Sequence, residues 1–259
     1  MTKKTDAGNS LVFAHRDKKI PLWIILPGLA DAPATSRRFG EHLIANGGTC
    51  WIPDLRDYAG AAEDYSDVRI EGIAERLILD VPAAARDAEK IVVGHSLGAY
   101  VGIALGEQES SVAGLVAIEG SFTKGNAVIV SQFAAVAGEH VGYQKLIDTL
   151  DGRSQLPGLE RYLDHVRATP PVLFSRLVEE LVGRWEEFAD RFKALPLPKL
   201  YIAGERSVGQ AAYAFANATL TYPSTVVVVP GVQHWVHIEA ADAAVHAIRG
   251  WAEVNVRHR

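Results

Sequence analysis

The strongest chemical signal in the chain lies at residues 94–98, where Gly94, His95, Ser96, Leu97 and Gly98 form the pattern Gly-x-Ser-x-Gly. An apolar stretch rich in β-branched residues precedes it, and a stretch suited to a helix follows. Between a strand and a helix, this pattern predicts a sharp turn that projects the serine hydroxyl from the carboxyl edge of a sheet. We therefore predict that Ser96 is a nucleophile. The alternative is a glycine-rich turn in which Ser96 only caps the helix.

The elements that must position Ser96 alternate between apolar strands and helices, which indicates an α/β fold with a parallel sheet covered on both faces. We expect a mostly parallel sheet of about eight strands. Residues 1–120 and 196–259 are expected to form this core. Residues 121–195 lack a comparable strand pattern, and we predict that they form an inserted helical cap. The expected strands are 10–15, 19–26, 50–53, 90–93, 112–118, 200–203 and 225–229, and the expected helices include 39–46, 68–79, 97–108, 143–150, 159–166, 174–192 and 211–220.

Composition excludes several classes of protein. The 259 residues carry a formal net charge of −5, which gives no basic surface for nucleic acid or an anionic membrane. Cys50 is the only cysteine, so neither an internal disulfide nor a cysteine cluster for a metal can form. No metal-binding or phosphate-cradling motif is recognisable, so we expect no cofactor. Without a signal-peptide pattern or a membrane-spanning stretch, we expect a cytoplasmic protein with a small-molecule substrate, its oligomeric state left open.

The chain resembles the α/β-hydrolase family over most of its length. The resemblance rests on the Ser96 elbow, the turn after the strand at 19–26, and residues 231–239, which read Gly-Val-Gln-His-Trp-Val-His-Ile-Glu. It implies that His234, just past the strand at 225–229, is the base that takes the serine proton. His237 is the rival, but we expect it to face away at the start of the last helix.

The same resemblance implies an oxyanion hole made by backbone N–H groups. The matching positions are Leu97, directly after the nucleophile, and Leu29, in the turn after the strand at 19–26. Many family members open that turn with His-Gly, whereas this chain has Pro27-Gly28. Because the donors are backbone groups, the substitution leaves the predicted hole intact.

The triad acid departs from the family pattern. Most members place an aspartate at the position that Ser207 occupies here, and a serine cannot carry the charge that stabilises an imidazolium. Glu119, directly after the strand at 112–118, is our predicted acid, because some members carry the acid at the end of that strand. Glu205 is the alternative, and a site without an acid is a third. Glu119 can also be read as a carboxylate that only caps the following helix.

The resemblance implies a carboxylic ester hydrolase, similar to esterases and lipases, that cleaves an ester, thioester or lactone of a small, apolar substrate through an acyl-enzyme on Ser96. Two other functions stay open, since one fold serves many chemistries. The same serine and histidine can support hydrolysis of a carbon–carbon bond. A receptor without catalytic activity, binding a small ligand in a hydrolase-like fold, is favoured by the serine at position 207.

Overall fold

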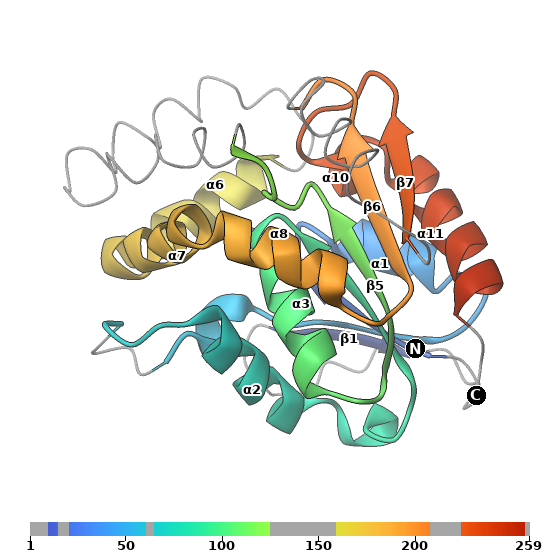
Figure 1. The fold of residues 1–259 in the computed structure, drawn as a ribbon, viewed down its shortest axis with the longest axis horizontal. Coiled ribbons are helices and arrows are strands. Elements are labelled where there is room, and N and C mark those ends of the chain that lie inside the picture. Colours follow the sequence, from blue (N-terminus) through green and yellow to red (C-terminus); the bar gives the residue numbers. More distant parts are fainter. Residues whose placement is uncertain (1–9, 15–20, 61–64, 125–158, 208–223, 257–259) are drawn as a thin grey trace.

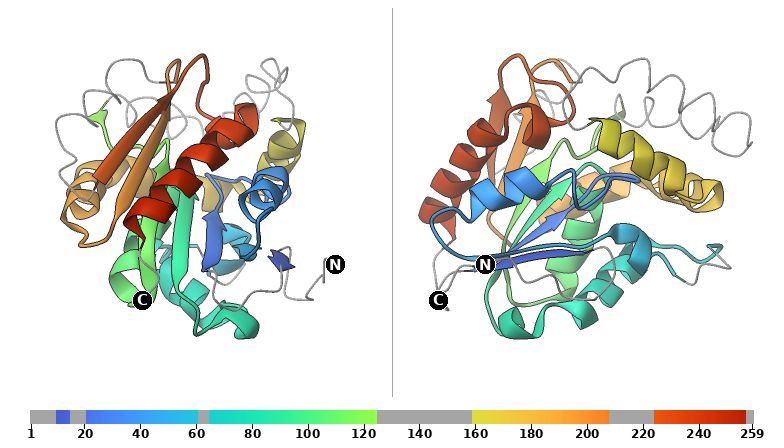
Figure 2. Two further views of the ribbon diagram at one scale, coloured as in Figure 1. Left: turned by 90° about the vertical axis from the view of Figure 1, so that its right-hand side faces the viewer. Right: turned by 180° about the vertical axis from the view of Figure 1, so that it is seen from behind.

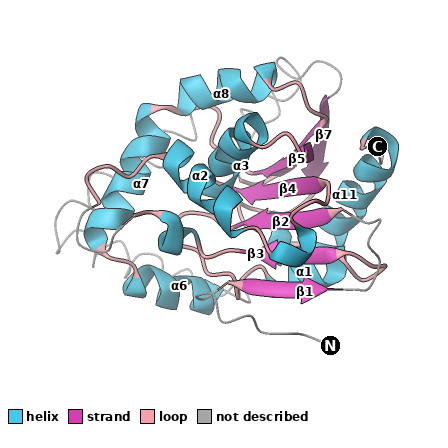
Figure 3. Ribbon diagram, turned by 90° about the horizontal axis from the view of Figure 1, so that it is seen from below, coloured by secondary structure: helices cyan, strands magenta, loops and turns pink. Residues whose placement is uncertain are grey.

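A sheet of seven strands organises the chain in the computed structural model, which describes residues 10–14, 21–60, 65–124, 159–207 and 224–256. The strand order is β1-β3-β2-β4-β5-β6-β7, and Figure 3 shows the first four strands stacked in this order. β1 runs antiparallel to β3, and the other neighbouring pairs are parallel. The sheet is thus mostly parallel, as predicted, with seven described strands against about eight expected. The strands are β1 Leu11–Ala14, β2 Leu22–Leu26, β3 Thr49–Ile52, β4 Lys90–His95, β5 Val112–Ile118, β6 Lys199–Gly204 and β7 Ser224–Val229.

Helices cover both faces of this sheet. α2, α3 and α8 lie in front of it in Figure 1, and α1 and α11 lie in front in the rear view of Figure 2. Side chains alternate between the two faces along each strand. In β4, Ile91 and Val93 therefore join the core beneath α1 and α11, while Val92 joins the core beneath α2, α3, α7 and α8. The helices are α1 Arg37–Leu43, α2 Ile70–Asp80, α3 Leu97–Gln108, α6 Leu159–Ala168, α7 Pro171–Gly183, α8 Trp185–Ala194, α10 Val236–Glu239 and α11 Ala241–Asn255.

The order of the strands fixes where a ligand can bind. The chain places β3 on one side of β2 and then places β4 on the other side. In parallel sheets, ligands bind at such a reversal, outside the carboxyl ends of the two strands. Ser96 directly follows β4, so it stands at this crevice.

The inserted segment between β5 and β6 contains α6, α7 and α8 in its described part. We expected one helix through residues 174–192, which is wrong, because α7 ends at Gly183 and α8 begins at Trp185. Glycine lowers helix stability, and Arg184 adopts a non-helical φ of −127° at the break. The predicted helices at 143–150 and 211–220 lie outside the described residues, and the boundaries of a cap domain stay a prediction. No helix in the described ranges combines the length and apolarity needed to cross a membrane.

Candidate active site

Ser96 occupies a strained turn between β4 and α3. Its φ of 51° and ψ of −113° lie outside the regions that residues with a side chain ordinarily adopt. Its N–H donates to the carbonyl oxygen of Ile118 at 2.9 Å, which ties the turn to the end of β5. A Cβ added to Gly94 would lie 2.3 Å from the carbonyl oxygen of Gly98, and one added to Gly98 would lie 2.1 Å from that of Leu26. Both glycines are therefore required by close backbone packing, as a nucleophile elbow requires.

Glu119 follows β5 directly and is completely buried. Its own N–H donates to the carbonyl oxygen of Ile202 at 2.8 Å. Its Oε1 accepts a hydrogen bond of 2.6 Å from the N–H of Gly204, at the end of β6, and its Oε2 accepts one from the hydroxyl of Ser207. Ser207 stands where the family resemblance implies an acid, and here its hydroxyl binds the carboxylate of Glu119.

His234 lies in the loop between β7 and α10, with 34% of its side chain exposed. Its Nδ1 lies 3.4 Å from Oε2 of Glu119. The carboxylate of Glu239 fixes the loop by accepting hydrogen bonds from the N–H groups of Gln233 and Trp235 at 3.1 and 3.2 Å. The predicted base and the predicted acid therefore come together at the carboxyl edge of the sheet.

The other candidate acid has a different partner. Glu205 is exposed, and its carboxylate accepts a hydrogen bond of 2.9 Å from the N–H of Gly231. Its position supports the turn after β7, whereas the carboxylate within reach of His234 is that of Glu119.

The loop after β2 packs directly on the elbow. A Cβ added to Gly28 would lie 2.8 Å from Nδ1 of His95 and 3.5 Å from Cβ of Ser96. Leu29, in this loop, and Leu97, the first residue of α3, thus flank the nucleophile. The first N–H groups of a helix have no partner within the helix, so the amide of Leu97 is free of the helical ladder. Both amides stay predicted oxyanion donors.

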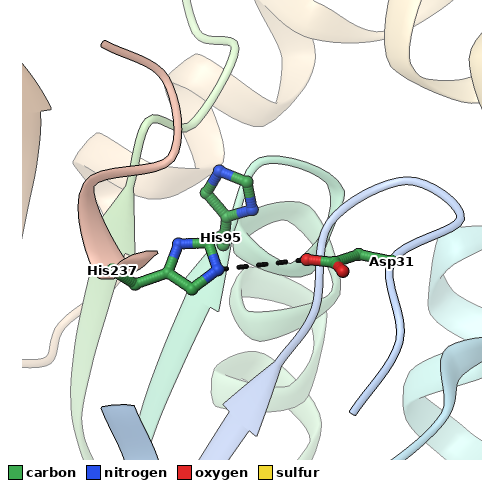
Figure 4. Close-up of side chains that lie close together, drawn as sticks. All are labelled: Asp31, His95 and His237. Carbon is green, nitrogen blue, oxygen red and sulfur yellow. Dashed lines mark ion pairs between the residues drawn. The ribbon is translucent and has the colours of Figure 1, made fainter. Parts of the chain in front are cut away.

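A buried polar cluster beside the elbow was not foreseen from the sequence. His237 does not face away, as we expected: it is 2% exposed and packs against the ring of His95 at a centroid distance of 4.3 Å. Asp31, from the loop after β2, completes the cluster, shown in Figure 4. Burial lowers the pKa of His237 to about 3 and that of His95 well below its ordinary value, and it raises the pKa of Asp31 to about 6. No local sequence pattern links these three residues, because they lie far apart in the chain.

A second polar network joins α6 to the edge of the sheet. Asp54 is fully buried, and its Oδ2 accepts a 2.8 Å hydrogen bond from Arg56. Nε2 of His165, in α6, lies 3.4 Å from the same oxygen. Nδ1 of His165 lies 3.2 Å from the carbonyl oxygen of Ala30, the residue after Leu29. The helix thus contacts the loop that carries a predicted oxyanion donor.

Comparisons with known proteins bear on the family and the fold of this chain. A sequence model described as the alpha/beta hydrolase family matches residues 23–248. No curated protein matches the chain. Similar solved structures include the enol-lactonase from Burkholderia xenovorans LB400, with 16% identity over 94% of this chain and 95% of that one and a TM-score of 0.76. Others are a thermophilic esterase from Thermogutta terrifontis, with 18% identity, coverage of 97% and 96% and a TM-score of 0.69, and MenH from S. aureus, with 17% identity, coverage of 95% and 98% and a TM-score of 0.69. At these identities, the likeness is one of fold.

Proposed function

Because the chain belongs to the alpha/beta hydrolase family, we propose that it is a serine hydrolase that cleaves a carboxylic ester, thioester or lactone of a small, apolar substrate. Ser96 is the nucleophile, His234 the general base and Glu119 the acid that orients it. The observation that carries the proposal is the contact of 3.4 Å between Nδ1 of His234 and the buried carboxylate of Glu119. This contact supports Glu119 as the acid partner of the base, which the serine at position 207 had left open.

The first half of the reaction forms an acyl-enzyme. The Ser96 oxygen attacks the substrate carbonyl carbon while Nε2 of His234 takes the hydroxyl proton, which gives a tetrahedral intermediate. The proton on Nδ1 of His234 faces Glu119, and the buried carboxylate stabilises the imidazolium. The imidazolium then gives its proton to the leaving oxygen, or to sulfur in a thioester, as the bond to the acyl carbon breaks.

The second half releases the acid. Neutral His234 takes a proton from water, whose oxygen attacks the acyl carbon, and the collapse of the second intermediate returns the proton to Ser96. During both halves, the amides of Leu97 and Leu29 hold the negative oxygen. Donors of this kind are worth about 10²–10³-fold in kcat each. The close packing of Gly28 on His95 supports this role, because it brings the loop of Leu29 against the elbow.

The choice of substrate class rests on family breadth and on the enol-lactonase and esterase among the similar structures. The receptor alternative rests on the serine at position 207, and the contact between Glu119 and His234 favours the hydrolase over it. Hydrolysis of a carbon–carbon bond uses the same serine and histidine, so turnover of the two substrate classes separates it from the proposal.

A series of p-nitrophenyl esters of increasing acyl length tests the proposed function. We expect turnover with an optimum at one chain length and its loss in Ser96→Ala. Ser111→Ala is a matched control, because Ser111 precedes β5 and lies at the opposite edge of the sheet from Ser96. Turnover of 1,3-dicarbonyl compounds without turnover of esters would replace the proposed reaction with cleavage of a carbon–carbon bond.

A further inference from the structure

Three side chains from separate segments of the active-site edge meet in a buried cluster (Figure 4). Asp31 follows β2, His95 ends β4 and His237 belongs to α10, and each is at most 4% exposed. Each offers one ligand atom, and these atoms lie within 4.8 Å of one another. Nε2 of His237 and Oδ2 of Asp31 are 3.9 Å apart, which is too far for a hydrogen bond. The three groups face each other with a gap between them.

Most of the polar side-chain atoms of these three residues lack a hydrogen-bond partner in the described part of the chain. They are Oδ2 of Asp31, Nδ1 of His95, and both ring nitrogens of His237. Native proteins seldom leave several buried polar atoms unsatisfied in one place, because each loses its hydration without compensation. A small ligand that binds one atom of each side chain would remove most of this penalty.

The ring of His95 is already oriented as a metal ligand. Its Nε2 lies 3.0 Å from the carbonyl oxygen of His234, which only accepts hydrogen bonds. Nε2 therefore carries the proton, and Nδ1 presents its lone pair to the cluster. Metal-bound histidines usually have this second contact, in which the other ring nitrogen donates to a carbonyl or carboxylate oxygen.

The donor set selects the class of ion. One carboxylate oxygen and two imidazole nitrogens suit Zn²⁺ and its first-row neighbours, whereas Mg²⁺ and Ca²⁺ prefer oxygen ligands throughout. Two aromatic rings also pack against the cluster: the edge of Phe39, at a centroid distance of 6.0 Å from His237, and the ring of His234, at 4.8 Å from His95. Neither is a lysine or an arginine, and His234 is neutral in the resting enzyme of the proposed mechanism.

Binding of a metal ion would require a small movement of the side chains. Bonds of about 2.0–2.2 Å in a tetrahedral site separate ligand atoms by roughly 3.4 Å. The gap of 3.9 Å between His237 and Asp31 is wider than this, so an ion would draw the two side chains together. Asp31 lies in the loop after β2, and Oδ2, the oxygen that would approach the ion, has no hydrogen bond to break in the described part of the chain.

We propose that Asp31, His95 and His237 form a binding site for a divalent transition-metal ion of the Zn²⁺ class. The ion joins the loop after β2, the end of β4 and α10, and it takes no part in the chemistry at Ser96. This site is independent of the proposed hydrolase function. It adjoins the loop of His234, because Nε2 of His95 donates a hydrogen bond to the carbonyl oxygen of His234.

The test uses the full chain, stripped with a chelator and then titrated with Zn²⁺ or Co²⁺ alone. We expect uptake of one ion per chain, visible Co²⁺ absorption bands of nitrogen and oxygen ligation, and a rise in Tm of about 5–10 °C at a hundredfold excess of Zn²⁺ over Kd. Asp31→Asn, which keeps the shape of the side chain, and His237→Leu, which removes the ring nitrogens, should each weaken Zn²⁺ binding at least about 100-fold.

His246→Asn is the matched control, because His246 is an exposed histidine of α11 and should leave binding unchanged. Ser96→Ala should also bind Zn²⁺ like the wild type, so failure of the hydrolase proposal and failure of the metal site give different results. The site would be overturned if the folded wild-type chain bound neither ion with a Kd below about 1 mM. It would also be overturned if Asp31→Asn and His237→Leu bound Zn²⁺ as tightly as the wild type.

Discussion

Nδ1 of His234 lies 3.4 Å from Oε2 of Glu119, although 115 positions separate the two residues in the chain. The carboxylate of Glu119 is completely buried and accepts hydrogen bonds from the amide of Gly204 and the hydroxyl of Ser207. The loops after β5, β6 and β7 thus converge on one carboxylate. The proposed catalytic acid therefore stands after β5, with two groups at the end of β6 supporting it.

Replacing this acid should lower turnover and leave substrate binding intact. For Glu119→Gln we expect kcat to fall about 10³–10⁴-fold with KM nearly unchanged, because the amide keeps the shape and loses the charge that stabilises the imidazolium. Steady-state kinetics on the best p-nitrophenyl ester measures this. Glu205→Gln is the control and should stay near wild type. Loss of activity in Glu205→Gln with a fully active Glu119→Gln would move the acid to position 205.

Moving the acid to the family's usual position tests the geometry of the same pair. In Glu119→Gln/Ser207→Asp, we expect at least about a tenfold recovery of kcat over Glu119→Gln, since the new carboxylate lies beside the place that Oε2 occupied. Ser207→Asp alone should be less active than wild type, because it sets two carboxylates against each other in a buried site. Equal activity of Glu119→Gln and of the double variant would show that a carboxylate at position 207 does not reach His234.

The sequence predicts the parts of this site that depend on local patterns. The bounds of α3 and β5 match the expected 97–108 and 112–118, because β5 is an unbroken apolar run and α3 is apolar until its last two residues. Glu119 could be proposed as the acid because it directly follows a strand whose end must meet the edge of Ser96. The burial of His237 and its meeting with Asp31 could not be predicted, because both depend on how loops far apart in sequence pack together. The split of 174–192 at Arg184 was missed because apolar spacing continues across it.

Close backbone packing at the elbow predicts a large difference between two helical glycines. For Gly98→Ala we expect a loss of at least about 2 kcal/mol in the free energy of unfolding, because the new Cβ would lie 2.1 Å from the carbonyl oxygen of Leu26. In Gly250→Ala, in α11, the new Cβ has no heavy atom within 4 Å, and the free energy of unfolding should rise by up to about 1 kcal/mol. Urea unfolding of the two variants measures both. Similar small effects would mean that the elbow has room for a side chain.

The network around Asp54 predicts a pH-dependent part of the stability. Burial alone would raise the pKa of Asp54, but hydrogen bonds from His165 and Arg56 outweigh it and lower the pKa to about 2, from 3.8. The folded state thus binds fewer protons than the unfolded state between about pH 2 and 4, so this stability is present above that window and is lost as the pH falls through it.

We therefore expect the free energy of unfolding of Asp54→Asn to be about 2 kcal/mol lower than that of the wild type at pH 7, with a smaller difference below pH 4. Chemical unfolding at pH 7, 5 and 3.5 measures the trend. Asp57→Asn is the control, because Asp57 is an exposed neighbour in the same segment. A difference between wild type and Asp54→Asn that stays constant with pH would mean that the charge of Asp54 contributes nothing.

The most direct test of the account is the reactivity of Ser96 toward a fluorophosphonate, which forms a stable covalent adduct with an activated serine and loses fluoride. We predict one adduct on the intact, folded chain, mapped to Ser96 by peptide mass spectrometry, absent in Ser96→Ala and formed much more slowly in His234→Ala and Glu119→Gln. No adduct on the folded wild type, or an adduct that persists in Ser96→Ala, would contradict the assignment of Ser96 as the nucleophile.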